Sequence, residues 1–189
     1  RFRSELEKRV NDRTRELQIA TRRLEEETVT DELTGLYNRK ELKRRSAELD
    51  KLLERKSHID ERYSVTVAYI DLDNFKQCND SFGHGFGDEI LKRTADVIRR
   101  HKRGYDLAFR VGGDEFVIIM PETTLGEGRS LVERLRDGFA AAMPSHAPIS
   151  ASVGLASTDE AAAMSMASTI DAADAALLAS KEGGKDRIT

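Results

Sequence analysis

Residues 63–73 read YSVTVAYIDLD and give the most apolar strand signal in the chain. The run includes the β-branched Val65 and Val67, and its length and apolarity are typical of a strand buried on both faces of a sheet. It ends in Asp71 and Asp73, and such carboxylates need partners because an unpaired charge is costly to desolvate. The stretch therefore predicts a central strand that carries acidic side chains to one end of the sheet.

Helix and strand signals alternate on both sides of this strand. Two short apolar runs, 107–111 and 116–120, flank Gly112-Gly113, which indicates a β-hairpin. A crossover helix from about Asp88, which could itself be the N-cap, connects the long strand to that hairpin. The other expected elements are a helix capped by Asn38 with Leu42, Leu49 and Leu52 on its apolar side, a helix at 125–142, a strand at 149–156 and a helix at 168–181. The pattern predicts one α/β (α+β) domain over 29–189, with a mixed central β-sheet flanked by helices.

Residues 1–28 differ from the rest of the chain in composition. The first 27 residues hold eight Lys or Arg, seven Asp or Glu, and no Gly or Pro. A heptad pattern places Val10 and Leu17 at a positions, although Arg13 and Glu27 weaken its d positions. We expect a coiled-coil signalling helix that pairs two chains and joins them to an upstream sensor domain missing from this fragment. The alternative is a solvated helix that packs on its own domain.

The overall composition narrows the class of protein. Among 189 residues, 31 Lys plus Arg nearly balance 34 Asp plus Glu, which leaves a net charge of −3. This balance gives no global field that would attract nucleic acid or an anionic membrane surface. A single cysteine, Cys78, excludes an internal disulfide, and the four histidines show no zinc-ligand spacing. We expect a cytoplasmic fragment without nucleic-acid or direct membrane contact. The alternative is the cytoplasmic part of a membrane-bound sensor.

A second acidic pair, Asp114-Glu115, directly follows the Gly112-Gly113 turn. Glycine lets the backbone turn sharply or lets a ligand approach closely, and five of the 13 glycines lie in 83–87 and 112–113. A divalent cation is one partner able to hold several carboxylates together, and oxygen-only ligands favour Mg²⁺ over zinc. Two simpler interpretations stay open at this point. In the first, Asp71 and Asp73 only mark the start of a loop; in the second, Asp114 and Glu115 only form a solvated hairpin tip.

Five segments of the chain also follow a recognisable order. They are 31–39 (DELTGLYNR), 71–76 (DLDNFK) continuing into Asn79-Asp80, Gly83-His84 and Gly87-Asp88, then 110–116 (RVGGDEF), 152–154 (SVG) and 173–177 (ADAAL). In this order they resemble the motif blocks of GGDEF domains, the diguanylate cyclases. The resemblance covers residues 31–187, and five blocks in the same order are far more specific than one GGDEF pentapeptide.

The resemblance implies a fold similar to the palm of polymerases and class III nucleotide cyclases, with one GTP bound per domain. Two domains meet face to face, and each ribose 3′-hydroxyl attacks the α-phosphate of the other GTP, giving cyclic di-GMP and two pyrophosphates. It also implies that Mg²⁺, or Mn²⁺ as the alternative ion, is held by Asp71, by the backbone carbonyl of Leu72 and by Asp114, with Glu115 in the same acidic cluster. Either Asp114 or Glu115 assists deprotonation of the hydroxyl, and the sequence leaves that choice open.

The same resemblance assigns residues to the nucleotide. Lys76 balances the charge of the triphosphate, and the backbone amides of Phe75 and Lys76 hold phosphate oxygens. Lys181 and Lys185 match the phosphate-binding pair of the family. Asn79 and Asp88 read the base, because a carboxylate accepts both donors on the edge of guanine and repels N1 of adenine. His84 matches a histidine near the nucleotide, although a turn-packing role is an equal alternative.

A separate inhibitory site is implied by Arg103-Gly104-Tyr105-Asp106, which is separated from Gly112 by five residues. This is the spacing of the R-x-x-D motif at which the family binds cyclic di-GMP as a feedback inhibitor. Arginine binds phosphate or guanine through two parallel hydrogen bonds, and aspartate accepts hydrogen bonds from the donor groups of guanine. Arg134 on the following helix is assigned a secondary contact.

Three residues depart from the family pattern. Leu178 replaces an aromatic residue, Lys185 an arginine and Asp186 an asparagine. Lysine keeps the charge but lacks the planar fork of arginine, so the departures bear on turnover and not on the fold. Three alternatives remain: a catalytically silent module that binds GTP or cyclic di-GMP, an oligomerising stalk, and a polymerase-like nucleotidyl transferase, for which no basic template groove is evident.

Overall fold

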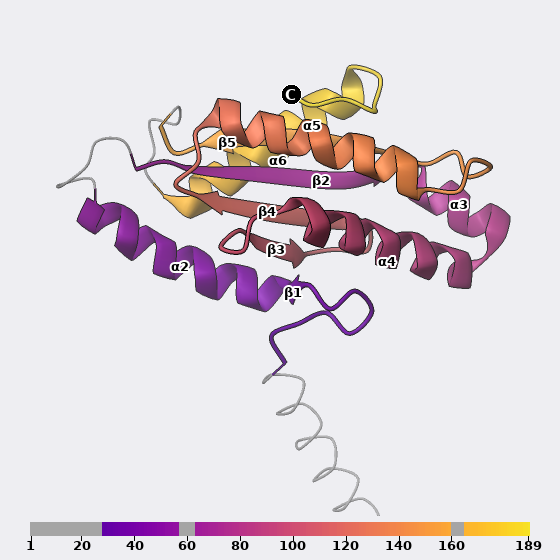
Figure 1. The fold of residues 1–189 in the computed structure, drawn as a ribbon, viewed down its shortest axis with the longest axis horizontal. Coiled ribbons are helices and arrows are strands. Elements are labelled where there is room, and N and C mark those ends of the chain that lie inside the picture. The colour runs from indigo at the N-terminus through magenta and orange to yellow at the C-terminus, as the bar shows by residue number, and fades with distance from the viewer. Residues whose placement is uncertain (1–27, 57–62, 160–164) are drawn as a thin grey trace, which may run out of the picture.

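The computed structural model describes residues 28–56, 63–159 and 165–189. A five-stranded sheet with strand order β1-β3-β4-β2-β5 lies between helices (Figure 1). The strands are β1 (Tyr37–Asn38), β2 (Val65–Asp73), β3 (Leu107–Arg110), β4 (Glu115–Pro121) and β5 (Ser150–Ser157), and the helices are α2 (Arg39–Lys56), α3 (Phe75–Phe82), α4 (His84–His101), α5 (Leu125–Ala142) and α6 (Met166–Glu182). The predicted heptad segment falls on residues 1–27, outside the described residues.

The sheet is mixed, as the sequence predicted. The strand β2 pairs antiparallel with both β4 and β5, and β3 pairs antiparallel with β4. The short strand β1 pairs parallel with β3. The crossover through α3 and α4 therefore leaves room for one strand between β2 and β3, and the hairpin returns β4 into that position.

Helices cover both faces of the sheet. Figure 1 shows α4 and α5 on one face and α6 on the other, with α2 along the lower edge. Alternate residues of β2 pack into the two layers: Ile70 and Leu72 belong to the core under α4 and α5, whereas Val65 and Val67 belong to the core under α2 and α6. Because side chains alternate along a strand, Asp71 lies on the α6 face.

The structure corrects the sequence prediction around the glycine-rich segment. The helix α4 begins at His84, four residues before the expected start, and Gly83 with φ of 87° is its N-cap. Asp88 therefore lies inside the helix, and the interpretation of Asp88 as an N-cap is wrong. The short helix α3 was not predicted, and neither was β1. In α2, Leu53 is buried at 7% exposure, whereas the expected core residue Leu52 is 41% exposed.

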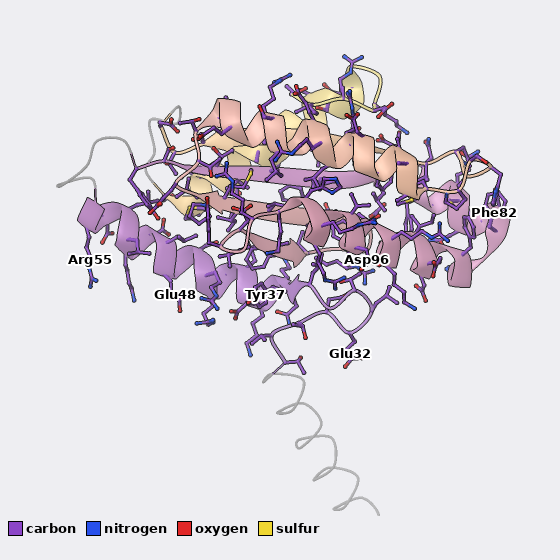
Figure 2. All side chains as sticks on the ribbon, viewed as in Figure 1. Glu32, Tyr37, Glu48, Arg55, Phe82 and Asp96 are labelled. Atoms are coloured by element: carbon purple, nitrogen blue, oxygen red, sulfur yellow. The ribbon has the colours of Figure 1, made fainter. Side chains whose placement is uncertain are left out.

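The helix α2 runs along the sheet from the hairpin end to the opposite end. Figure 2 shows Tyr37 just before the start of α2 and Arg55 at its far end, with Phe82 at the other extreme of the molecule. Tyr37 packs on Phe109 of β3, with 5.6 Å between the ring centroids, which fixes the start of α2 beside the sheet. Within the described residues, no helix has the length and apolarity that crossing a bilayer requires.

Candidate active site

The two acidic segments of the sequence meet at one end of the sheet. Asp71 of β2 lies directly opposite Glu115 of β4 in the antiparallel register. The backbone N–H of Leu72 donates to the carbonyl oxygen of Asp114 at 3.2 Å. A Cβ on Gly112 would lie 2.0 Å from Oε2 of Glu115, so the glycine leaves the space that the carboxylate of Glu115 occupies here. The structure thus brings Asp71, Asp114 and Glu115 together, and we call these three residues the acidic cluster.

Two carboxylates of the acidic cluster, those of Asp71 and Glu115, have a raised pKa. Burial raises the pKa of Asp71, and the negative charges of Asp114 and Asp73 add to the effect. Burial likewise raises the pKa of Glu115, with further contributions from Asp71 and Asp114. Lys181 of α6 opposes these shifts, since its Nζ lies 2.8 Å from Oδ2 of Asp71. The cluster therefore carries an excess of negative charge over the single lysine that contacts it among the described residues.

The donor set fits a hard divalent cation. The side-chain ligands of the acidic cluster are carboxylate oxygens, which suit Mg²⁺ or Mn²⁺, and Mg²⁺ commonly takes only one or two carboxylates and keeps several waters. The described residues contain no ready-made group of three or more His, Cys, Asp or Glu side chains arranged to hold a metal. A site here therefore depends on a few carboxylates with backbone or nucleotide oxygens, and the metal role of Asp71, Leu72, Asp114 and Glu115 stays a prediction.

Asp73 has a different environment from Asp71 although both lie on the same face of β2. Its carboxylate accepts hydrogen bonds from Oγ of Ser150 at 2.8 Å, from Oγ of Ser152 at 2.8 Å and from the backbone N–H of Asp186 at 3.1 Å. Asp73 is only 2% exposed. These contacts attach β5 and the C-terminal segment to the end of β2, so Asp73 is a structural anchor.

The C-terminal segment holds the two predicted phosphate-binding lysines near the end of β2. Lys181 contacts Asp71, as described, and Nζ of Lys185 donates to Oδ1 of Asn74 at 2.9 Å. Lys185 and Asp186 have φ of 64° and 46°, a left-handed conformation that lets the chain turn back after α6. Both lysines are thus placed within reach of the strand that carries the acidic cluster, and their binding of phosphate stays a prediction.

The predicted base-reading residues lie together between α3 and α4. Oδ1 of Asn79 is buried and has no hydrogen-bond partner among the described residues. A Cβ on Gly87 would lie 1.9 Å from that oxygen, so glycine lets the side chain approach α4. Asp88 follows Gly87 and is exposed, as are Lys76 and His84. A buried polar atom without a partner is costly, which is consistent with an oxygen reserved for a ligand.

Arg103 and Asp106 form a tight turn before β3. Oδ2 of Asp106 accepts a hydrogen bond from the backbone N–H of Arg103 at 2.6 Å, and Nη1 of Arg103 donates to the hydroxyl of Tyr105 at 3.0 Å. Arg103 is exposed, whereas Asp106 is 2% exposed and its Oδ1 has no partner among the described residues. Arg134 is exposed on α5 and donates to the carbonyl of Ser130 on its own helix. Inhibitor binding by these residues stays a prediction.

Sequence reasoning missed two features of this end of the molecule. Arg110 donates to the carboxylate of Asp31 at 3.1 Å and to the carbonyl of Gly113 at 2.8 Å, so it joins the hairpin tip to the segment before β1. The opposite charges of Asp31 and Arg110, in two different motif blocks, were the available signal. Tyr69 is half-buried two residues before Asp71, and burial together with the charge of Glu115 raises its pKa to about 12.

Asp31→Asn is expected to destabilise the domain by about 1 kcal/mol at pH 7. Burial raises the pKa of Asp31, but hydrogen bonds from Thr34 and the charge of Arg110 outweigh it, and the net pKa is lowered from 3.8. A lowered pKa gives stability that is present above pH 3.8 and lost as the pH falls through the folded-state pKa. Urea unfolding at several pH values measures this, with Glu32→Gln at the exposed neighbouring position as the control. A deficit that does not shrink below pH 3.8 would contradict the assignment.

Comparison with known proteins agrees with this geometry. Residues 28–187 match the family described as "Diguanylate cyclase, GGDEF domain". The diguanylate cyclase DgcP of Pseudomonas aeruginosa is 37% identical over 166 residues, which are 86% of this chain and 24% of DgcP, so the chain spans about a quarter of that relative's length.

Two solved structures have the same fold. The GGDEF domain of DgcB from Caulobacter crescentus, in complex with c-di-GMP, has a TM-score of 0.73 at 33% identity and covers 86% of this chain and 95% of its own. Diguanylate cyclase SiaD from Pseudomonas aeruginosa, in complex with its activator SiaC, has a TM-score of 0.74 at 33% identity and covers 99% of this chain and 71% of its own. The family match over most of the chain and these similarities show that the chain belongs to the GGDEF-domain family of diguanylate cyclases.

Proposed function

We propose that this domain condenses two GTP molecules into cyclic di-GMP and two pyrophosphates across a homodimer. The observation that carries the proposal is the register of β2 and β4, which places Asp71 opposite Glu115 with Asp114 alongside. This arrangement supplies carboxylates that need positive charge next to a strand end, where a triphosphate and its counter-ion can sit.

The residues of the chain divide the work by position. Asp71, Asp114 and the carbonyl of Leu72 would hold a divalent cation, which would neutralise phosphate charge and lower the pKa of the attacking 3′-hydroxyl. Lys181, which contacts Asp71 in the structure, would bind the triphosphate. Lys76, Lys185 and the backbone amides of Phe75 and Lys76 bind the phosphates of the nucleotide. Asn79 and Asp88 bind guanine, and His84 lies beside it. Glu115 or Asp114 accepts the proton of the hydroxyl.

Incubation of the purified chain with GTP and Mg²⁺, followed by chromatography of the products, tests the proposal. Cyclic di-GMP and pyrophosphate should appear in a 1:2 ratio, which the stoichiometry of the reaction requires. A dimeric sample that binds GTP without forming cyclic di-GMP would instead support a catalytically silent binding module. A linear polymer of nucleotides would support a polymerase-like transferase.

Asp88→Ala is expected to weaken the preference for GTP over ATP by about 10²-fold in kcat/KM. The carboxylate accepts the N1–H and 2-amino donors of guanine, and its charge repels the N1 acceptor of adenine. Competition between GTP and ATP in one reaction measures the ratio directly. Glu89→Ala, at the next exposed position of α4, is the matched control and should keep the wild-type preference. An unchanged ratio in Asp88→Ala would remove Asp88 from base recognition.

Arg103→Ala is expected to raise the cyclic di-GMP concentration needed for half-inhibition at least about tenfold, because an arginine fork contributes two charge-assisted hydrogen bonds. The uninhibited rate should stay at its wild-type value, since Arg103 lies before β3 and away from the acidic cluster. Inhibition curves at fixed GTP measure the effect, with the exposed Arg100→Ala as the control. Superimposable curves for Arg103→Ala and wild type would discard Arg103, Asp106 and Arg134 as a feedback site.

We also propose that the chain works in the cytoplasm, where GTP is available, and that its N-terminal segment receives the signal of an upstream sensor. Each domain holds half of a catalytic centre, so the rate depends on how two domains are presented to each other. A coiled-coil pairing of residues 1–28 would control that presentation.

A further inference from the structure

A groove between α2 and α6 opens next to the acidic cluster. It has a volume of about 460 Å³, and Tyr69 of β2 and Val111 beside the hairpin line it together with the two helices. Tyr69 precedes Asp71 by two residues on the same face of β2, because side chains alternate along a strand. The groove therefore leads from the space between the helices to the end of the sheet that carries Asp71 and Glu115.

The two walls of the groove carry mostly opposite charges; the exception is Asp50 of α2, whose Oδ1 accepts a hydrogen bond from the backbone N–H of Met166 at 2.6 Å. Arg39 and Lys43 line it from α2, and Asp171 and Asp174 line it from α6. All four side chains are exposed. Across residues 28–56, 63–159 and 165–189, none of the four forms an ion pair or a hydrogen bond with another described side chain, so the walls do not neutralise each other. We call these four residues the groove charges.

An exposed face of α6 extends from the groove toward the end of the sheet that carries the acidic cluster. Asp171, Asp174, Ala175 and Leu178 have the i, i+3, i+4, i+7 spacing of one helix face, and all are exposed. Leu178 is 58% exposed, more than any other large apolar side chain in the described part of the chain. Lys181 follows Leu178 by three residues on the same face of α6, and it contacts Asp71. Beside the groove charges, Leu178 supplies apolar surface that a docked partner would bury, as the core of a protein–protein interface does.

We propose that this surface docks against the same surface of a second copy of the chain during synthesis. In a two-fold contact each patch meets itself, so the cationic wall of one copy faces the anionic wall of the other. Arg39 then pairs with Asp174 across the interface and Lys43 with Asp171, each pair being formed twice, and Leu178 is covered. The inference rests on the proposed function, which requires two domains to face each other at their acidic clusters.

Charge reversal in separate chains gives a sharp test. Homodimers of Arg39→Glu place an introduced glutamate against Asp174, and homodimers of Asp174→Arg place Arg39 against an introduced arginine, so both repel. Each should form cyclic di-GMP at least about 20-fold more slowly than wild type, because like charges across an interface oppose association. A heterodimer of the two variants has one wild-type pair and one reversed attractive pair. Co-expressed with different affinity tags and purified through both, it should regain most of the wild-type rate.

This recovery separates contact between chains from contact within one chain. If Arg39 served only its own domain, each chain of the heterodimer would keep its defect and the rate would stay low. Lys92→Glu on α4, an exposed position on the opposite face of the sheet, is the control and should keep the wild-type rate. Wild-type rates in both single variants, or no recovery in the heterodimer, would overturn the proposal.

A second measurement does not depend on catalysis. Chains carrying Lys43→Cys and chains carrying Asp171→Cys are mixed with GTP and Mg²⁺ under mild oxidation, with the native Cys78 buried in both. A disulfide-linked heterodimer should form, and more of it than of either homodimer. Absence of this product would overturn the docking surface. Should wild type itself form no cyclic di-GMP, the proposed function would fail while the cross-link still decides whether the groove charges meet.

Discussion

Asp114→Ala is expected to reduce cyclic di-GMP synthesis by at least about 10³-fold while the domain keeps its fold. The side chain belongs to the acidic cluster, and its removal takes away one of the few carboxylates able to hold a cation beside the triphosphate. The fold should persist because the hydrogen bond that joins this residue to β2 uses its backbone carbonyl, which accepts from Leu72 at 3.2 Å and remains in alanine.

Initial rates of product formation at saturating GTP and Mg²⁺ measure this effect, with circular dichroism as the check on folding. Asp114→Glu is the matched variant, since it keeps the carboxylate and should keep a substantial part of the rate. A folded Asp114→Ala protein that retains roughly a tenth or more of the wild-type rate would remove Asp114 from the catalytic machinery.

Asp73→Ala is expected to destabilise the domain by about 3 kcal/mol, the largest effect on stability that we predict for one side chain. Asp73 is buried and accepts hydrogen bonds from Ser150, Ser152 and the backbone of Asp186. Alanine would leave these donors without their charged acceptor. The C-terminal segment that carries Lys185 would also loosen, so we expect a higher KM for GTP.

Urea unfolding gives the free-energy difference, and Asp80→Ala is the control. Asp80 is an exposed carboxylate on α3, and its removal should change stability by less than about 0.5 kcal/mol. If Asp73→Ala were as stable as Asp80→Ala and as active as wild type, Asp73 would not anchor the C-terminal segment.

Sequence patterns predicted the central part of the fold because local and tertiary preferences agree there. The apolar run that ends at Asp71 became a strand buried on both faces, and the helix expected at 125–142 has those bounds in the structure. A capping box between Thr124 and Glu127 fixes the start of that helix, which is a purely local signal.

The glycine-rich segment was harder to predict because glycine has no strong preference of its own. Gly83 has a left-handed φ and ends α3, whereas Gly85 and Gly87 lie inside α4. Gly87 is needed there because the side chain of Asn79 occupies the space of its Cβ, a tertiary contact that no periodicity reveals. The short strand β1 depends in the same way on pairing with β3.

The acidic cluster was predictable from the order of the elements around it. Asp71 ends the central strand, and Asp114 lies in a hairpin turn. The two apolar runs around that turn indicated a hairpin, and when one of its strands pairs with the central strand, the two acidic segments become neighbours. The partners from distant segments were not predictable from charge alone. The contact of Lys181 with Asp71 and that of Arg110 with Asp31 each need the full topology.

A crystal structure of the chain with Mn²⁺ and a non-hydrolysable GTP analogue tests the central assignment most directly, because manganese can be located by its anomalous scattering. We predict a manganese peak between the carboxylates of Asp71 and Asp114, with Lys181 moved from Asp71 to the triphosphate. Nucleotide bound with no manganese at the acidic cluster, and Lys181 still 2.8 Å from Asp71, would contradict the account.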